Sequence, residues 1–229
     1  QKLETEEIIS FKNIKIKDLS FCYQKDENIL DQINLDIKKG EKIGLIGKTG
    51  SGKTTFVDLI LGLIKPTKGE ITIDERNINT FDRSWKNILG YVPQETFLLD
   101  DTIRNNIVFD NKIKVDEKAL NLAIKNSEVD EFLKENNDLN LNIGERGITL
   151  SGGQKQRIGI ARALYKKPQI IIFDESTSSL DVKTEKKIMD SIYNLDKTKT
   201  LIIISHRDST LLKCDKIFEI KSKKLIQIK

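Results

Sequence analysis

The chain has 229 residues, of which 38% are hydrophobic and 32% charged, and its net charge is +4 at pH 7. This length suits one large domain or a domain with an inserted lobe, and the composition excludes a disordered tail. The weak positive charge comes from scattered surface lysines, so we expect no nucleic-acid partner, and two distant cysteines exclude a secreted disulfide scaffold.

The N-terminal part of the chain is predicted to hold several strands around one helix. Residues 1–11 are polar and are expected to be the end of a linker. A helix is predicted from Lys53 to about Leu63. Alternating or continuous apolar residues predict strands at Ile14–Phe21 (an edge-type strand), Ile29–Ile37, Ile43–Ile46, around Ile71 and Ile73, and at Leu89–Val92.

The middle of the chain, from about 95 to 167, carries helical spacing and little strand signal, which indicates an inserted helical lobe. The predicted helices are Thr102–Ile107, Glu117–Asn126, Glu131–Leu133 and Gln154–Tyr165. The C-terminal part is predicted to hold buried strands at Ile170–Phe173 and Leu201–Ile204, a helix at Thr184–Leu195, and a hairpin of Ile217–Ile220 and Leu225–Ile228. Strand–helix alternation favours an α/β fold with a mainly parallel sheet.

A glycine loop follows the strand at Ile43–Ile46 and opens the helix that begins at Lys53. Glycines let successive backbone N–H groups point at phosphate oxygens, and the helix N-terminus adds partial positive charge. Lys53 is predicted to reach the β- and γ-phosphates, and the Thr54 hydroxyl to bind Mg²⁺. The loop fits G-x-x-x-x-G-K-[ST] at every fixed position, with Gly47, Lys48, Thr49, Gly50, Ser51, Gly52, Lys53 and Thr54.

Two carboxylates follow the apolar run Ile170–Phe173, at the C-terminal end of a predicted parallel strand. Ligands of open α/β sheets bind outside these strand ends. Asp174 is predicted to hold Mg²⁺ through its waters, and Glu175 to orient and deprotonate an attacking water. Alone, the pattern also fits an ordinary strand end, but beside a phosphate loop it indicates hydrolysis.

Two further polar residues follow predicted strands. His206 comes after Leu201–Ile204 and could donate to the γ-phosphate while accepting from a neighbour. Gln94 comes after Leu89–Val92 and could touch Mg²⁺ or the attacking water. Each residue, taken alone, is more often structural, and it is the shared sheet edge that makes them candidates.

A second glycine-rich stretch, LSGGQKQR at Leu150–Arg157, also opens a predicted helix. Such a helix N-terminus is a natural anion site. The chain therefore carries two loops of this kind about a hundred residues apart, and the local pattern does not explain the second one.

The motifs GKTGSGKTT, YVPQ, LSGGQKQR, IIIFDE, SLD and SHR, in this order, resemble those of the ATP-binding cassette (ABC) ATPases. The resemblance runs from Phe21 to the C-terminus. It implies a P-loop NTPase (RecA-like) parallel-sheet core at about 12–94 and 168–229, with an antiparallel β edge. It also implies an inserted α-helical subdomain at about 95–167, and ATP with Mg²⁺ as the ligands of an ATPase.

The resemblance also implies roles at matching positions of this chain. Tyr23 matches the aromatic residue that stacks on adenine, Gln94 the Q-loop residue, Asp181 the D-loop residue and His206 the switch histidine. Metal contacts are expected from Thr54, Gln94 and Asp174, and catalysis from Lys53, Gln94, Glu175 and His206. The remaining nucleotide contacts are expected from the phosphate loop with Thr55 and from the signature residues Ser151, Gly152, Gly153 and Gln154.

In this family the signature loop faces the phosphate loop of a second copy, arranged head to tail. Glu175 and Ser151 are both intact here, so the resemblance implies a homodimer with ATP at the interface. The segment YVPQETFLLDDTIRNNI and the X-loop IGERG at Ile143–Gly147 resemble the exporter branch, in which the X-loop touches a membrane domain. The chain looks closest to bacterial lipid-linked oligosaccharide flippases.

We therefore expect the ATPase domain of an exporter at the cytoplasmic face of a membrane, such as the bacterial inner membrane. The chain itself is expected to be soluble, because no apolar run approaches the roughly 20 residues of a membrane helix. Three alternatives stay open: the separate ATPase subunit of another transporter, a non-transport ABC protein, and a nucleotide-binding module that only dimerises.

Overall fold

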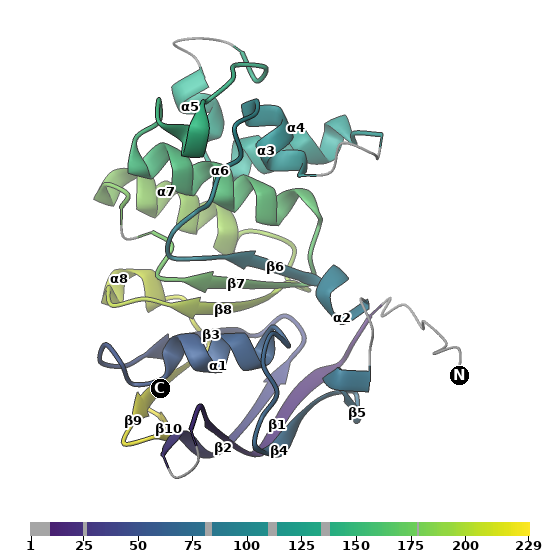
Figure 1. The fold of residues 1–229 in the computed structure, drawn as a ribbon, viewed down its shortest axis with the longest axis vertical. Coiled ribbons are helices and arrows are strands. Elements are labelled where there is room, and N and C mark those ends of the chain that lie inside the picture. The colour runs from purple at the N-terminus through teal and green to yellow at the C-terminus, as the bar shows by residue number, and fades with distance from the viewer. Residues whose placement is uncertain (1–9, 25–26, 81–83, 110–113, 134–137, 178) are drawn as a thin grey trace. The chain divides into compact units, whose positions relative to one another are not determined.

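The computed structural model describes residues 10–24, 27–80, 84–109, 114–133, 138–177 and 179–229 (Figure 1). The chain folds into two compact units. The first unit comprises residues 1–89, 169–174 and 197–229, and the second comprises 90–168 and 175–196. The second unit thus includes 175–196, a segment that the sequence analysis grouped with the core.

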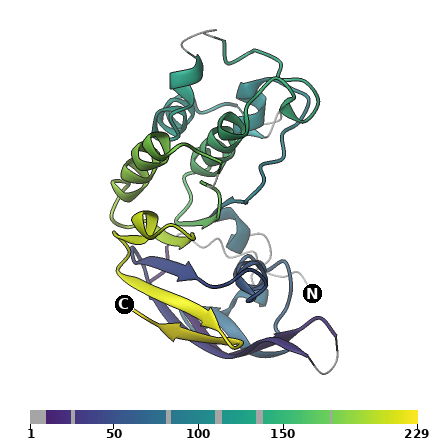
Figure 2. The same cartoon turned by 90° about the vertical axis from the view of Figure 1, so that its left-hand side faces the viewer.

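The first unit contains a mainly parallel sheet whose strands run in the order β10-β9-β3-β8-β7. β3 pairs in parallel with β8 and β9, and β7 pairs in parallel with β8. β9 and β10 form the antiparallel hairpin predicted at the C-terminus (Figure 2). Every residue of β7 and β8 is buried, as their continuous apolar sequence requires. The strands are β3 (Lys42–Ile46), β7 (Ile170–Asp174), β8 (Thr200–Ile204), β9 (Lys216–Lys221) and β10 (Lys224–Gln227).

A second, antiparallel sheet of the first unit has the order β2-β1-β4-β5. Its strands are β1 (Asn13–Cys22), β2 (Asn28–Lys38), β4 (Lys68–Ile73) and β5 (Arg76–Asn77). β1 lies between β2 and β4, so the prediction of an edge-type strand at Ile14–Phe21 is wrong. The alternating pattern reports only that one face is buried, and this holds equally for an interior strand.

The first unit also contains short helices. The helix after the phosphate loop, α1 (Lys53–Ile60), is shorter than predicted because Gly62 follows with a left-handed φ of 67°. The other helices, which the sequence analysis did not predict, are η1 (Ile78–Thr80), α2 (Ser84–Asn87) and α8 (Asp208–Leu211). Phe11, in the segment expected to be a linker, is only 2% exposed, so the packed core already includes this residue.

The second unit is mostly helical, and α6 packs against α3, α4 and α5, while α4 also contacts α7. The strand β6 (Leu89–Val92) spans the boundary between the two units. No helix in the described ranges is both long and apolar enough to cross a membrane. The helices are α3 (Ile103–Val108), α4 (Glu117–Asn126), α5 (Val129–Leu133), η2 (Glu145–Gly147), α6 (Gly152–Tyr165) and α7 (Val182–Tyr193).

Candidate nucleotide-binding site

The glycine loop between β3 and α1 is tightly curled. A Cβ atom added to Gly47 would lie 2.5 Å from the Ser51 Oγ and 2.9 Å from the carbonyl oxygen of Ile220, so no other residue fits there. Gly52 is the N-cap of α1 with a φ of 103°, a left-handed conformation that favours glycine. The two glycines therefore allow the loop to close on itself directly before a helix.

The interior of this loop suits an anion. The Ser51 Oγ is buried and has no hydrogen-bond partner among the described residues. No side chain caps α1, and the first N–H groups of a helix have no partner within it. The Ser51 hydroxyl and the N–H groups of the first helical turn can donate to the oxygen atoms of a phosphate, and the helix dipole adds to the attraction.

Lys53 supplies a positive charge to the loop. Its side chain is 6% exposed, and its Nζ donates to the carbonyl oxygens of Gly47 at 2.8 Å and Lys48 at 3.3 Å. A buried ammonium group is costly unless it is paired, so these carbonyl contacts hold the charge inside the curl. The contact of Lys53 with phosphates stays a prediction.

The register of the parallel sheet places Asp174 close to the phosphate loop. Leu45 of β3 pairs with Ile204 of β8, and Ile204 pairs with Asp174 at the end of β7. Two strand spacings separate Leu45 from Asp174, or about 10 Å. β8 is the strand between them, and His206 lies two residues beyond its last residue, Ile204, with an exposed side chain. The first unit thus brings the loop, Asp174 and His206 to one edge of the sheet.

These residues also fit a magnesium ion. Asp174 is 5% exposed at the strand end, and Thr54, at the start of α1, is exposed. Within the described part of the chain, no three His, Cys, Asp or Glu side chains gather as a metal site. Mg²⁺ does not need such a cage, because it usually binds one or two carboxylates together with substrate phosphates and waters.

Tyr23 is held beside the phosphate-loop helix. Its hydroxyl lies 3.2 Å from the Thr55 Oγ1, and its ring meets the Phe21 ring edge-on, with centroids 4.8 Å apart. The side chain is nevertheless 63% exposed. A tethered and exposed aromatic face is well suited to stacking on a base. Thr55 therefore contacts Tyr23, in addition to any nucleotide contact that the resemblance implies.

Glu175 and Gln94 belong to the second unit. Glu175 is half-buried and has a φ of 49°, in the left-handed region that costs a non-glycine residue on the order of 1 kcal/mol. Other non-glycine residues, such as Glu75, share this left-handed conformation, and the sequence pattern contained no sign of it at Glu175. Gln94 is exposed and directly follows Pro93.

The signature residues form the start of α6. The Ser151 Oγ accepts a hydrogen bond from the Gln154 backbone N–H at 3.3 Å, and the Gln154 Oε1 accepts one from the Ser151 N–H at 2.8 Å. This capping box explains why the helix begins at Gly152 rather than at Gln154 as predicted. The N–H groups of Gly152 and Gly153 have no acceptor within the helix, so they can donate to an anion.

Asp181 caps the next helix. Its carboxylate accepts hydrogen bonds from the backbone N–H groups of Lys183 at 3.1 Å and Thr184 at 3.0 Å. The hydrogen bonds, led by that from the Thr184 side chain, lower the pKa of Asp181. Asp before a helical run is a common N-cap, so this role of Asp181 was open to prediction in addition to the D-loop role; the helix begins at Val182, two residues before the predicted start.

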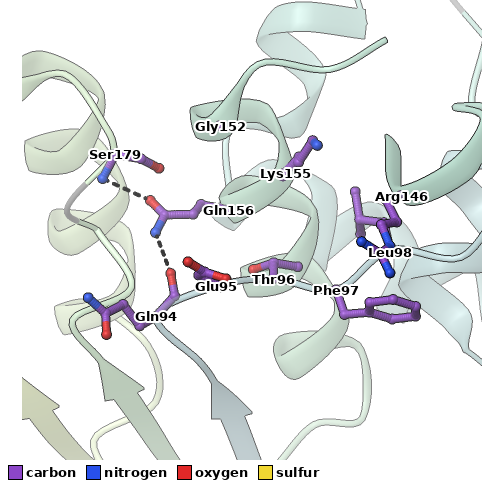
Figure 3. A pocket seen from close by; sticks show the side chains of 10 residues that line it. All are labelled: Gln94, Glu95, Thr96, Phe97, Leu98, Arg146, Gly152, Lys155, Gln156 and Ser179. Atoms are coloured by element: carbon purple, nitrogen blue, oxygen red, sulfur yellow. Dashed lines mark hydrogen bonds between the residues drawn. The ribbon is translucent and has the colours of Figure 1, made fainter. Parts of the chain in front are cut away.

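A pocket of about 590 Å³ lies within the second unit (Figure 3). Two of its lining residues, Arg146 and Lys155, are cationic, and Phe97 gives it an apolar side chain that is 60% exposed. The residues that line it are Gln94, Glu95, Thr96, Phe97, Leu98, Arg146, Gly152, Lys155, Gln156 and Ser179.

The pocket wall is held by Arg162 of α6, which the sequence analysis did not single out. Its guanidinium donates to the carbonyl oxygens of Asn106 at 2.7 Å and Phe97 at 2.9 Å, and lies 4.5 Å from the centre of the Phe109 ring. Burial lowers the pKa of Arg162 to about 10, so the group stays charged at neutral pH. The segment after Gln94 is thereby fastened to α6.

The fold and the phosphate loop define a nucleotide-binding P-loop NTPase domain. Residues 30–178 match the family model described as "ABC transporter", and the chain belongs to that family. It is an ATP-binding domain of a family that hydrolyses ATP.

Named relatives agree with this assignment. The chain is 41% identical over 209 residues to an ATP-dependent lipid A-core flippase of Francisella tularensis, covering 90% of this chain and 34% of the relative. It is 38% identical over 221 residues to an uncharacterized ABC transporter ATP-binding protein of Haemophilus influenzae, covering 93% and 36%. The chain therefore spans about a third of the length of these relatives.

A solved structure is also similar. It is a bacterial Atm1-family ABC exporter with ATP bound, which matches with a TM-score of 0.90 at 31% sequence identity. The match covers 97% of this chain and 40% of that one. The predicted fold class and the predicted family are therefore both confirmed.

Proposed function

We propose that this chain is the ATP-hydrolysing motor of an exporter, working as a head-to-tail dimer at the cytoplasmic face of a membrane. The observation that carries the proposal is that two anion-binding helix N-termini occur in one chain but in different compact units. The phosphate loop belongs to the first unit, and Ser151–Gln154 to the second. In a head-to-tail dimer, the phosphate loop of each copy would face Ser151–Gln154 of the other copy.

In the first unit, Lys53 binds the β- and γ-phosphates, and Tyr23 stacks on the adenine ring. Thr54 and Asp174 would hold Mg²⁺, and Gln94, which belongs to the second unit, would be a further contact. When bound, Mg²⁺ neutralises charge on the phosphates and aligns them. The other phosphate-loop residues and Thr55 surround the phosphates with N–H and hydroxyl donors.

Hydrolysis requires a base beside the γ-phosphate. Glu175 orients the attacking water and accepts its proton, and Gln94 and His206 contact the water or the γ-phosphate. Ser151, Gly152, Gly153 and Gln154 of the second copy close the site, with Asp181 next to them. Loss of the γ-phosphate removes the bridge between the copies, so the dimer opens.

The cargo is proposed to be a lipid or a lipid-linked oligosaccharide. The support is the similarity to a protein named as a lipid A-core flippase. A membrane domain, on the same or a partner polypeptide, would receive the movement through the second unit. The pocket lined by Phe97 and Arg146 is the proposed contact for it, because it lies between the segment after Gln94 and the X-loop.

The dimer is tested with Glu175→Gln, which removes the base and keeps the size of the side chain. With ATP and Mg²⁺ this variant should elute as a stable dimer in size-exclusion chromatography, whereas the wild-type chain turns ATP over and returns to monomer. Glu75→Gln is the matched control, because Glu75 is an exposed glutamate that also has a left-handed φ, of 71°.

Two outcomes would contradict the proposal. If the Glu175→Gln variant stays monomeric at high protein concentration, ATP is not shared between two copies. If it releases phosphate as fast as the Glu75→Gln control, Glu175 is not the base. An absence of phosphate release from the wild-type chain at every concentration would favour a module that binds ATP without hydrolysing it.

A further inference from the structure

The side chain of Gln156 bridges two loops of the second unit. It lies on α6, two residues after the signature residue Gln154, and is 4% exposed. Its Nε2 donates to the carbonyl oxygen of Gln94 at 3.2 Å, and its Oε1 accepts from the backbone N–H of Ser179 at 3.3 Å (Figure 3). Only one orientation of the amide satisfies both contacts, because a carbonyl must accept and an N–H must donate.

The two loops joined in this way both carry proposed site residues. Gln94 itself is one of them, and in Figure 3 its side chain points away from Gln156 while its carbonyl takes the hydrogen bond. Ser179 stands two residues before Asp181, the N-cap of α7. A Cβ atom added to Gly153 would lie 3.4 Å from both the Leu180 side chain and the Ser179 carbonyl, so this loop also rests on the start of α6.

We infer that Gln156 is a positioning residue for ATP hydrolysis. It fixes the loop that contains Gln94 and the loop that leads to Asp181 to α6, the helix that begins with the signature residues, so that these three segments move as one body. The inference rests on the proposed function. Gln156 touches backbone atoms rather than nucleotide, and it therefore acts through the residues it places. A small shift of a positioned group is enough to slow a reaction strongly.

The test compares Gln156→Met with the wild-type 229-residue chain. Methionine has nearly the same length and flexibility as glutamine, but it cannot make either hydrogen bond. Gln227→Met is the matched control, because Gln227 is an exposed glutamine whose Nε2 also donates to a backbone carbonyl, that of Lys229 at 2.9 Å. The measurements are kcat and KM for ATP, the Tm, and hydrogen exchange of the Ser179 amide.

Gln156→Met is expected to lower kcat by about tenfold or more, a loss of about 1.4 kcal/mol, and to change KM by less than about twofold, since phosphate binding by the first unit is untouched. The Ser179 amide should exchange faster than in the wild type. Gln156→Glu should lower kcat as well, because a carboxylate can accept from Ser179 but cannot donate to Gln94. Gln227→Met should behave as the wild type.

A purely structural role would lower the Tm and leave kcat per folded molecule unchanged, and that result would overturn the inference. An unchanged Ser179 exchange rate in Gln156→Met would overturn it too. If the wild-type chain shows no ATP hydrolysis, the proposed function fails. The exchange measurement then still decides whether Gln156 holds this loop, because it does not depend on turnover.

Discussion

Gly159 lies in the middle of α6, where glycine is an unfavourable residue, and substituting it tests how closely the chain after Gln94 approaches this helix. A Cβ atom added there would lie 2.4 Å from the Thr96 Oγ1, 2.8 Å from its Cγ2 and 3.2 Å from its Cβ. Such contacts are far inside van der Waals distance. We therefore predict that Gly159→Ala destabilises the protein, although alanine is the better helix former.

The magnitude follows from two opposing effects. Overpacking costs about 1–3 kcal/mol, and replacing a helical glycine by alanine returns about 0.8–1 kcal/mol. The difference is a net loss of up to about 2 kcal/mol, which lowers the Tm of a protein of this size by up to about 8 °C.

A second substitution, Thr96→Ala, tests whether the contact with Thr96 causes the loss of stability in Gly159→Ala. The Thr96 Oγ1 is buried with no hydrogen-bond partner among the described residues, so Thr96→Ala removes an unsatisfied hydroxyl and should be neutral or stabilising. It also removes the two nearest clashing atoms. The double variant should therefore be at least as stable as the wild type, with a coupling energy of about 1 kcal/mol or more between the two sites.

The assay is thermal unfolding of the four proteins of this double-mutant cycle, followed by circular dichroism. Additive effects, in which Gly159→Ala destabilises equally with threonine or alanine at position 96, would refute the reasoning. So would a Gly159→Ala variant that is more stable than the wild type.

Two further predictions concern the nucleotide. Ser151→Asp keeps an N-cap for α6 and should leave the Tm near the wild-type value. ATP-dependent dimerisation should weaken roughly a thousandfold, because the new aspartate would repel the phosphates of ATP. Two unit charges about 4 Å apart at an effective dielectric constant near 20 repel by about 4 kcal/mol. If Ser151→Asp dimerises as the wild type does in sedimentation experiments, the signature loop is not part of the ATP site. Tyr23→Ala should weaken ATP binding by about 2–10-fold, which is the contribution of one aromatic stack. Tyr23→Phe keeps the ring and loses only the contact with Thr55, so it should bind ATP as the wild type does. A fluorescent-nucleotide titration measures both variants.

The local motifs could be predicted because each is a contiguous segment. The phosphate loop from Gly47 to Thr54 needs only a strand before it and a helix after it, and both are present as predicted. The helix Glu117–Asn126 was predicted with its observed bounds, because its apolar residues repeat at helical spacing. The starts of α6 and α7 were placed two residues late, since a cap is decided by where one side chain turns back to the backbone.

Other features depend on residues that are distant in sequence. The interior position of β1 is set by pairing with both β2 and β4, which one alternating pattern cannot reveal. The strain at Glu175 depends on how the chain leaves β7. Gln156 stands 62 residues from Gln94 and 23 from Ser179, and nothing in the sequence around it marks either partner.

The sequence by itself determined the class of chemistry, because phosphate binding is carried out by backbone N–H groups whose direction a short glycine pattern sets. It also determined that one chain carries two such loops. Only the tertiary structure decided which side chains hold those loops in place. Strand register brings Asp174 to the edge of the sheet where the phosphate loop begins, and helix packing buries the Gln156 amide between two backbone groups, the Gln94 carbonyl and the Ser179 N–H.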